Sequence, residues 1–380
     1  MAIAENSSTT RKIGGVQDKR NSNLELYRII VMLLIIAHHY VVNSGLTAVD
    51  GPIWNDNMSV KSLFLFLFGA WGKTGINCFV LITGYFMCQS KITPRKFFKL
   101  LFEVYFYRII IGCIFLITGY TELSLTIIAK MILPFTSLST GFTGCFLVFY
   151  LTIPFLTVLV NNLNEKMHLR LLLLIFLFYI AFASIPKMEI GYSYVSWFMC
   201  LFFIASYIRK YPKKLFENTK FWGWASLFML IVSSLSVIGF VWIGTRIDNP
   251  NDGTFWLSDS YKILAVITSI TWFMFFKNIT LKKSRVINAL GGATFGVLLI
   301  HANSDAMRQW LWKDVLDNVG IYDNGSLIYL HSIVSVFAIF IICAVIDISR
   351  QKLIEKPFFK LFDRLWDKVT IWYTRKERII

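Results

Sequence analysis

The chain has 380 residues, of which 56% are hydrophobic and only 16% are charged, and its formal net charge is +16. Soluble domains carry about 25% charged residues, so the composition excludes an ordinary soluble domain and predicts a protein embedded in a membrane. The basic residues are spread over many connecting segments instead of gathering in one patch, which argues against nucleic acid as a partner.

Ten apolar runs dominate the chain after a polar leader. Residues 1–22 are rich in Ser, Thr and Asn, and we expect them to be disordered. Each later run approaches the roughly 20 residues that a helix needs to cross a bilayer. The runs are 26–44, 62–87, 97–119, 142–160, 169–186, 194–209, 222–244, 259–277, 288–308 and 328–349. Only helices satisfy their own backbone polar groups in lipid, so we predict an all-α polytopic protein with one transmembrane domain over 23–365 and a basic tail over 366–380.

The basic residues alternate between connections. Most of the 38 Lys and Arg residues lie in the leader, in the tail and in the connections after the second, fourth, sixth and eighth runs. The opposite connections hold six: Lys61, Lys130, Lys187, Arg246, Arg308 and Lys313. Lys and Arg are enriched in cytoplasmic loops, so the pattern predicts a multi-pass protein of the plasma membrane with both termini in the cytoplasm.

The first run holds the densest set of ionisable residues. His39 follows Arg28 by eleven residues, which places both within about 20° on one helical face and about 16 Å apart along the axis. Glu25 lies one turn before Arg28, and His38 points about 80° away. A membrane histidine can simply bond a neighbouring helix, and an arginine can reach the headgroups. The presence of Arg28 and His39 on one face of the helix favours a functional role over these structural ones. An imidazole can take a proton from a hydroxyl near neutral pH.

Five segments resemble the integral membrane acyltransferases of acyltransferase family 3. They are ELYRIIVMLLIIAHHY (25–40), GKTGINCFVLITGYFM (72–87), SWFMCLFFIASYIRKYP (196–212), GATFGVLLIH (292–301) and IEKPFFKLF (354–362). The resemblance covers about residues 20 to 365. It implies a ten-helix enzyme that O-acetylates a carbohydrate of the cell envelope, and it is closest to the short forms without an extracellular hydrolase-like domain.

The resemblance also implies roles for individual residues. His39 corresponds to the catalytic base, and Arg28 to a residue that holds the acyl-CoA donor from the cytoplasmic side. Where the family has an R-x-x-R element, this sequence has Arg95, Lys96 and Lys99. The second Arg is therefore missing at that spacing, and bidentate phosphate recognition is weaker with Lys. Glu355 matches the Glu of the family's E-K-P element, and we expect it to support the donor side or the structure.

Several other residues leave two interpretations open. His301 could contact the acceptor or simply bond another helix. Asp305 and Arg308, three residues apart, could pair with each other. Arg108 lies inside the third run and needs a partner, which Glu103 is poorly placed to supply. No spacing of His, Cys, Asp or Glu indicates a metal site, and we expect none.

The expected reaction moves an acyl group across the membrane. Acetyl-CoA is the expected co-substrate, with succinyl or longer chains as alternatives, and a hydroxyl of a cell-surface or lipid-linked carbohydrate is the acceptor. His39 would deprotonate that hydroxyl directly or form a transient acyl-imidazole. The main alternative is a transporter or flippase of a lipid-linked sugar or small metabolite, although paired Gly- or Pro-broken helices are not evident. A glycosyltransferase and a sensor or assembly protein are further alternatives.

Overall fold

The computed structural model describes residues 21–133, 141–188, 190–251 and 253–364, and every regular element in these residues is a helix. The prediction of an all-α protein is therefore confirmed for the described part of the chain. Of the leader expected to be disordered, only Asn21 and Ser22 are described, and Ser22 already begins the first helix. The predicted basic tail lies outside the described residues.

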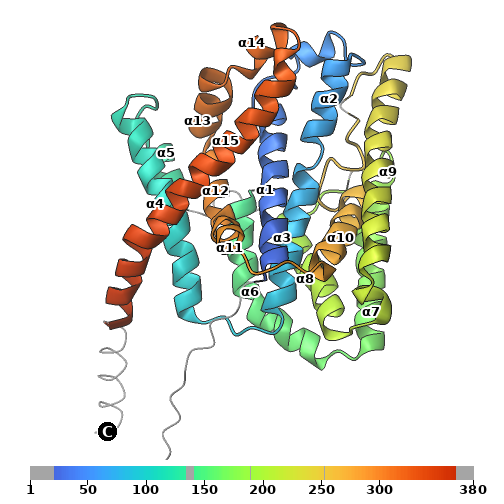
Figure 1. The fold of residues 1–380 in the computed structure, drawn as a ribbon, viewed down its shortest axis with the longest axis vertical. Coiled ribbons are helices and arrows are strands. Elements are labelled where there is room, and N and C mark those ends of the chain that lie inside the picture. Colours follow the sequence, from blue (N-terminus) through green and yellow to red (C-terminus); the bar gives the residue numbers. More distant parts are fainter. Residues whose placement is uncertain (1–20, 134–140, 189, 252, 365–380) are drawn as a thin grey trace, which may run out of the picture.

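Fifteen α-helices make up the described part of the chain (Figure 1). The first eight are α1 (Ser22–Val42), α2 (Val60–Gly69), α3 (Gly72–Met87), α4 (Pro94–Ile117), α5 (Leu125–Ile132), α6 (Phe142–Asn162), α7 (Glu165–Ile175) and α8 (Tyr194–Lys210). The others are α9 (Thr219–Arg246), α10 (Ile263–Asn278), α11 (Arg285–Gly292), α12 (Thr294–His301), α13 (Asp305–Gln309), α14 (Asn318–Asp323) and α15 (Leu327–Arg350). Short 3-10 or π turns are η1 (Pro52–Trp54), η2 (Phe176–Ala181), η3 (Phe182–Ser184), η4 (Lys214–Glu217), η5 (Trp310–Val315) and η6 (Gln351–Glu355).

Seven helical segments of the described chain are long and apolar enough to cross a membrane. They are Ser22–Val42, Val60–Met87, Pro94–Ile117, Phe142–Asn162, Glu165–Ser184, Thr219–Arg246 and Leu327–Arg364. An eighth is a bent pair, Arg285–His301 and Asp305–Asp323, whose two parts meet at 94°. Each predicted run falls on helix, but α8 has 17 residues and α10 has 16, fewer than the roughly 20 that a bilayer requires. The helices indicate a multi-pass membrane protein, and the number ten stays a prediction.

The outer faces of the long helices are apolar, as contact with lipid requires. On α9 the exposed side chains include Leu227, Phe228, Ile231 and Leu235, whereas Ser226 and Ser233 face inward. A helix that is apolar all round with small or polar residues on its packed face is typical of membrane bundles. The inward Ser233 hydroxyl lies 3.0 Å from the Thr268 hydroxyl of α10, so a polar pair holds these two helices together.

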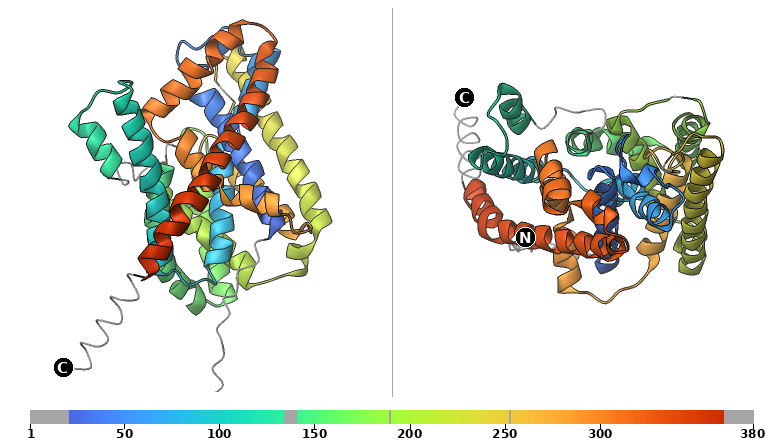
Figure 2. Two further views of the ribbon diagram at one scale, coloured as in Figure 1. Left: turned by 60° about the vertical axis from the view of Figure 1, so that its left-hand side comes forward. Right: turned by 90° about the horizontal axis from the view of Figure 1, so that it is seen from above.

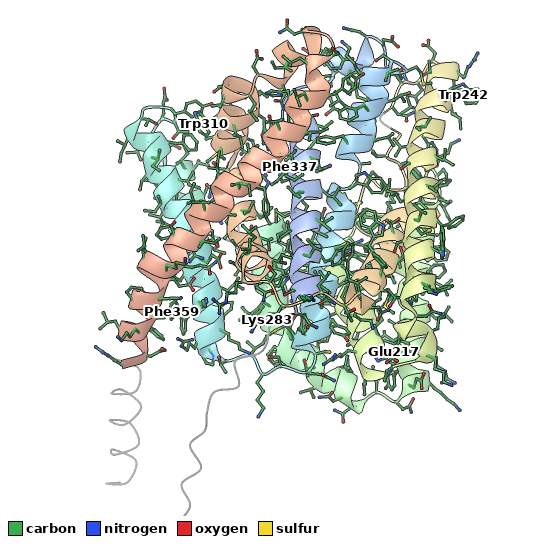
Figure 3. The ribbon with its side chains drawn as sticks, in the orientation of Figure 1. Glu217, Trp242, Lys283, Trp310, Phe337 and Phe359 are labelled. Carbon is green, nitrogen blue, oxygen red and sulfur yellow. The ribbon has the colours of Figure 1, made fainter. Side chains whose placement is uncertain are left out.

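The two ends of the bundle differ in charge and define its orientation in the figures. We call the end where α1 begins the basal end and the opposite end, with α14, the apical end (Figure 1). Lys283 and Glu217 lie at the basal end and Trp242 lies at the apical end (Figure 3). The helix that continues α15 ends at the basal end as well. The predicted cytoplasmic connections, including 211–218 and 279–284, meet at this end.

Helix α1 runs through the interior of the bundle, with α15 on one side and α9 on the far side (Figure 2). It packs against α2, α3, α10, α11, α12 and α15. Glycines allow the close approach to α2 and α3: a Cβ atom on Gly75 of α3 would lie 2.8 Å from Ile35 Cγ1, and one on Gly69 of α2 would lie 2.9 Å from Val41 Cβ. The helix with the two adjacent histidines is therefore packed closely against its neighbours.

The predicted ninth run, 288–308, is not one straight helix. The chain leaves α12 at His301 and starts α13 at Asp305, where the Ser304 side chain accepts a hydrogen bond from the Met307 amide. Serine is a preferred residue at this capping position because its oxygen satisfies an unpaired amide of the first turn. The bend brings α13 and η5 to the apical end, where Trp310 lies (Figure 3).

Candidate functional site

The last turn of α1 presents two imidazoles to different neighbours. His38 and His39 are both partly exposed, whereas the His301 side chain is completely buried. The ring centroids of His39 and His301 are 5.2 Å apart, and those of His38 and His39 are 5.8 Å apart. Helix packing thus joins residues 262 positions apart in the sequence, and it leaves only the α1 member of the His39–His301 pair accessible.

The hydrogen bonds define which nitrogen of each ring carries its proton. His301 Nδ1 lies 2.6 Å from the Val297 carbonyl oxygen, which can only accept, so His301 Nδ1 is the donor. His301 Nε2 lies 3.1 Å from His39 Nδ1. In a neutral His301 ring, Nε2 must accept, so His39 Nδ1 donates. A neutral His39 then has its unprotonated nitrogen at Nε2, which is the form that a general base requires.

His38 is held by the end of α2 and the start of α3. Its Nδ1 lies 2.6 Å from the Gly69 carbonyl oxygen and donates to it. The ring fits over Gly72, where a Cβ atom would lie 2.3 Å from His38 Cγ. His38 also lines a cavity of about 220 Å³ together with Phe66 and Lys73. The structure therefore fixes the orientation of His38 through α2 and α3, independently of the pair that His39 forms with His301.

Arg28 and Glu25 lie near the basal start of α1 and pair with each other. Arg28 Nη1 is 3.3 Å from Glu25 Oε1, and the arginine side chain is 27% exposed while the glutamate is 8% exposed. A Cβ atom on Gly291 would lie 2.5 Å from Glu25 Oε2, so α11 approaches α1 at this point. The Arg28 guanidinium therefore stays partly accessible at the basal end of α1, on the helical face that also carries His39.

Arg95 and Lys99, the predicted phosphate ligands, begin α4 and pair with carboxylates of the last helix. Arg95 makes two parallel bonds to Asp363, at 2.6 and 2.8 Å, and both side chains are exposed. Lys99 Nζ lies 2.7 Å from Glu355 Oε1, and Glu355 is buried. The structure thus places Arg28 and Arg95 on different helices with different acidic partners.

A buried cluster around Arg350 was missed in the sequence. Its guanidinium bonds to Asp347 at 2.9 Å, to Glu355 at 2.7 Å and to Glu103 at 3.1 Å, and the Arg350 side chain is only 2% exposed. Glu103, which is poorly placed for Arg108, is therefore a partner of Arg350. The remaining Asp347 bonds come from Tyr107 and Gln351. The cluster ties α4 to the end of α15, and Glu355 is one of its carboxylates.

Two further residues, Arg308 and Lys73, complete the apical side of the site, and each had a weak signal in the sequence. Arg308 Nη1 bonds to Asp305 Oδ1 at 3.0 Å, which confirms the predicted i,i+3 pair. Lys73 donates to the Tyr194 hydroxyl at 2.7 Å and lies 4.0 Å from Asp259. Lys73 is a charge inside a predicted span, and such residues are functional candidates. Arg108, by contrast, donates to the Lys130 carbonyl and lies away from this site.

The acidic, Cys and His side chains of the described residues form no group of three or more that could hold a metal ion. The candidate site combines imidazoles, cations, carboxylates and hydroxyl groups. This set can move a proton and stabilise negative charge.

Comparison with known proteins gives one match. A family model described as an acyltransferase domain matches residues 21–347. The chain matches no curated protein and no solved structure. The matched region includes α1, the bend after α12 and most of α15, and hence both His39 and His301.

Proposed function

Because the chain belongs to the acyltransferase 3 family and is a multi-pass membrane protein, we propose that it transfers an acetyl group from cytoplasmic acetyl-CoA to a hydroxyl of a cell-surface or lipid-linked carbohydrate. The observation that carries this proposal is the hydrogen bond between His39 and His301, which supports His39 as the catalytic base. Acetyl is the expected acyl group by family resemblance.

The proposed chemistry uses His39 Nε2. It takes the proton of the acceptor hydroxyl as the oxygen attacks the thioester carbonyl carbon. The carbon–sulfur bond then breaks, and the imidazolium returns the proton to the departing CoA thiolate. The His301 ring accepts from His39 Nδ1 throughout and stabilises the imidazolium that forms, much as a carboxylate orients the histidine of a catalytic triad. Formation of an acyl-imidazole at Nε2 is the stepwise alternative.

The donor would bind at the basal end, which we propose to be cytoplasmic. CoA carries phosphates, and this end has Arg28, Arg95 and many lysines. The Arg95–Asp363 pair is exposed, and exposed pairs contribute only about 0–1 kcal/mol, so a phosphate can replace Asp363 at little cost. Lys99 is tied to the buried Glu355, which makes Arg95 the better candidate of the two. From here the pantetheine arm would extend along α1 toward His39.

The test combines a chemical readout with a cellular one. Purified protein in lipid nanodiscs should release free CoA from acetyl-CoA when cell-envelope glycans are added, and His39→Ala should abolish the release. Mass spectrometry of glycans from cells expressing the wild type, but not His39→Ala at equal abundance, should show a shift of ~42 Da, the mass added when acetyl replaces hydrogen in an O-acyl transfer. Glycan export that changes without any acyl shift would instead support the transporter or flippase.

A further inference from the structure

Two cavities flank the apical end of α1, and His38, the chain neighbour of the proposed base, lines one of them. One has a volume of about 350 Å³ and is lined by Asn43, Arg308 and Lys313, among others. The other, of about 220 Å³, is lined by His38 and Lys73. Both have Val42 and Thr47 in their walls, so they adjoin each other across the last turn of α1. An acceptor that reaches His39 from the apical end must contact the residues that line these cavities.

Cations gather at the larger cavity although the apical end is poor in them. Six basic residues lie in the predicted apical connections, and three of them meet here: Lys130, Arg308 and Lys313. Asp305 is shared by two of these, at 3.0 Å from Arg308 Nη1 and 3.5 Å from Lys130 Nζ. Lys313 makes no salt bridge within the described ranges. Topology does not account for this cluster, because lysine and arginine excess belongs to the cytoplasmic side.

The nearby carboxylates cancel only part of these charges. Asp305 pairs with Arg308 and Lys130, and Asp314 accepts from the neutral Tyr120 and Gln309, so three cations face two carboxylates. Asp259 pairs with Lys73 on the other side of α1. The guanidinium of Arg308 has further capacity, because its Nε is buried without a hydrogen-bond partner in the described structure. A guanidinium offers five N–H donors in a planar fork that matches the oxygens of a phosphate or carboxylate.

We propose that the acceptor carries an anionic group, a phosphate or a carboxylate, which Arg308 and Lys313 hold while its hydroxyl meets His39. This inference rests on the proposed function and adds the class of acceptor. Neutral glycans lack the group that these two cations recognise, so they bind more weakly. Lys73 lies across Val42 and Thr47 from this anion site and faces the remainder of the acceptor in the smaller cavity.

Binding without chemistry tests the inference separately from catalysis. Isothermal titration of the wild type in nanodiscs would use three probes: glucose 6-phosphate, glucuronate and glucose. At least one charged probe should bind about tenfold more tightly than glucose, the effect expected of a charge-assisted hydrogen bond. The preference should disappear in Arg308→Gln/Lys313→Gln and weaken at high salt. The matched control is Arg246→Gln, whose side chain stacks on Trp242 at the same end and should leave binding unchanged.

The two charged probes separate the sources of the anion, because a preference for glucose 6-phosphate indicates a phosphate-bearing acceptor and one for glucuronate an acidic sugar. Equal binding of charged and neutral probes, or a charge preference that survives in the double variant, would overturn the inference. Failure of the proposed function would give a different result. Acetyl-CoA would stay intact with every acceptor, while the protein would still prefer the charged probes over glucose.

Discussion

The ring of His38 occupies the space that a side chain on Gly72 would need: a Cβ atom there would lie 2.3 Å from His38 Cγ and 2.4 Å from Cδ2. The same ring donates to the Gly69 carbonyl at 2.6 Å. One glycine of α3 thus sets how closely the histidine-bearing turn of α1 approaches its neighbour. Because small residues at interfaces allow membrane helices to pack closely, this contact is a sensitive point for mutation.

We expect Gly72→Ala to displace His38 and lower the rate of acyl transfer, with a loss of stability of about 1–3 kcal/mol from overpacking. Thermal unfolding in detergent and acetyl-CoA turnover would measure both effects. The double variant Gly72→Ala/His38→Ala should recover part of the stability, since it removes the ring but leaves the Cβ atom of residue 38, 2.7 Å from the new one. Gly239→Ala is the control, because a Cβ there meets nothing within 4 Å. A Gly72→Ala protein as stable and active as the wild type would contradict this packing.

His39 and His301 should differ in how strongly they affect kcat. Loss of a general base costs about 10²–10⁴-fold, so His39→Ala should lower kcat by that factor. His301→Leu removes only the orienting partner and should cost about 10–100-fold, as a supporting residue does. The KM for acetyl-CoA should change little in both variants. His301→Gln, which keeps an acceptor, should retain more activity than His301→Leu; equal losses in these two would argue against the orienting role.

Arg95→Gln should raise the KM for acetyl-CoA about tenfold, because a charge-assisted bond to phosphate is lost. The effect should vanish with an acetyl-pantetheine substrate, which lacks the nucleotide phosphates. Asp363→Asn is the informative companion: by releasing Arg95 from its bidentate pair, it should leave KM unchanged or lower it. If Asp363→Asn instead raises KM as much as Arg95→Gln does, the ion pair serves the structure and not the donor.

Removal of the buried guanidinium should be among the most destabilising changes in the chain. Arg350→Met leaves Glu103, Asp347 and Glu355 in the interior with Lys99 as the remaining cation. Breaking a buried ion pair costs about 3–5 kcal/mol because it leaves unpaired buried charge. The midpoint of unfolding in detergent would report the loss. Arg350→Met/Glu355→Gln should recover part of it, and the exposed neighbour Lys352→Met should have no effect. A midpoint unchanged in Arg350→Met would contradict the cluster.

The sequence by itself determined the features that depend on one segment at a time. Apolar runs of sufficient length predict helices because lipid leaves the backbone no other way to bond, and the structure confirms helix in every run. Helical periodicity alone places Arg28 and His39 on one stripe of α1, since that spacing is local. The Asp305–Arg308 pair, one turn apart, could be predicted for the same reason.

Only the tertiary structure decided which helices meet and at which faces. The His39–His301 pair, the fit of His38 over Gly72 and the Arg350 cluster join residues that are far apart in the chain. Hydropathy also could not predict the bend after His301, which places Arg308 near the end of α1. The physical reason is that helices apolar on all sides have no hydrophobic stripe that points to a partner. In lipid, their rotation is set by small residues and a few polar contacts, and these take effect only once the bundle has formed.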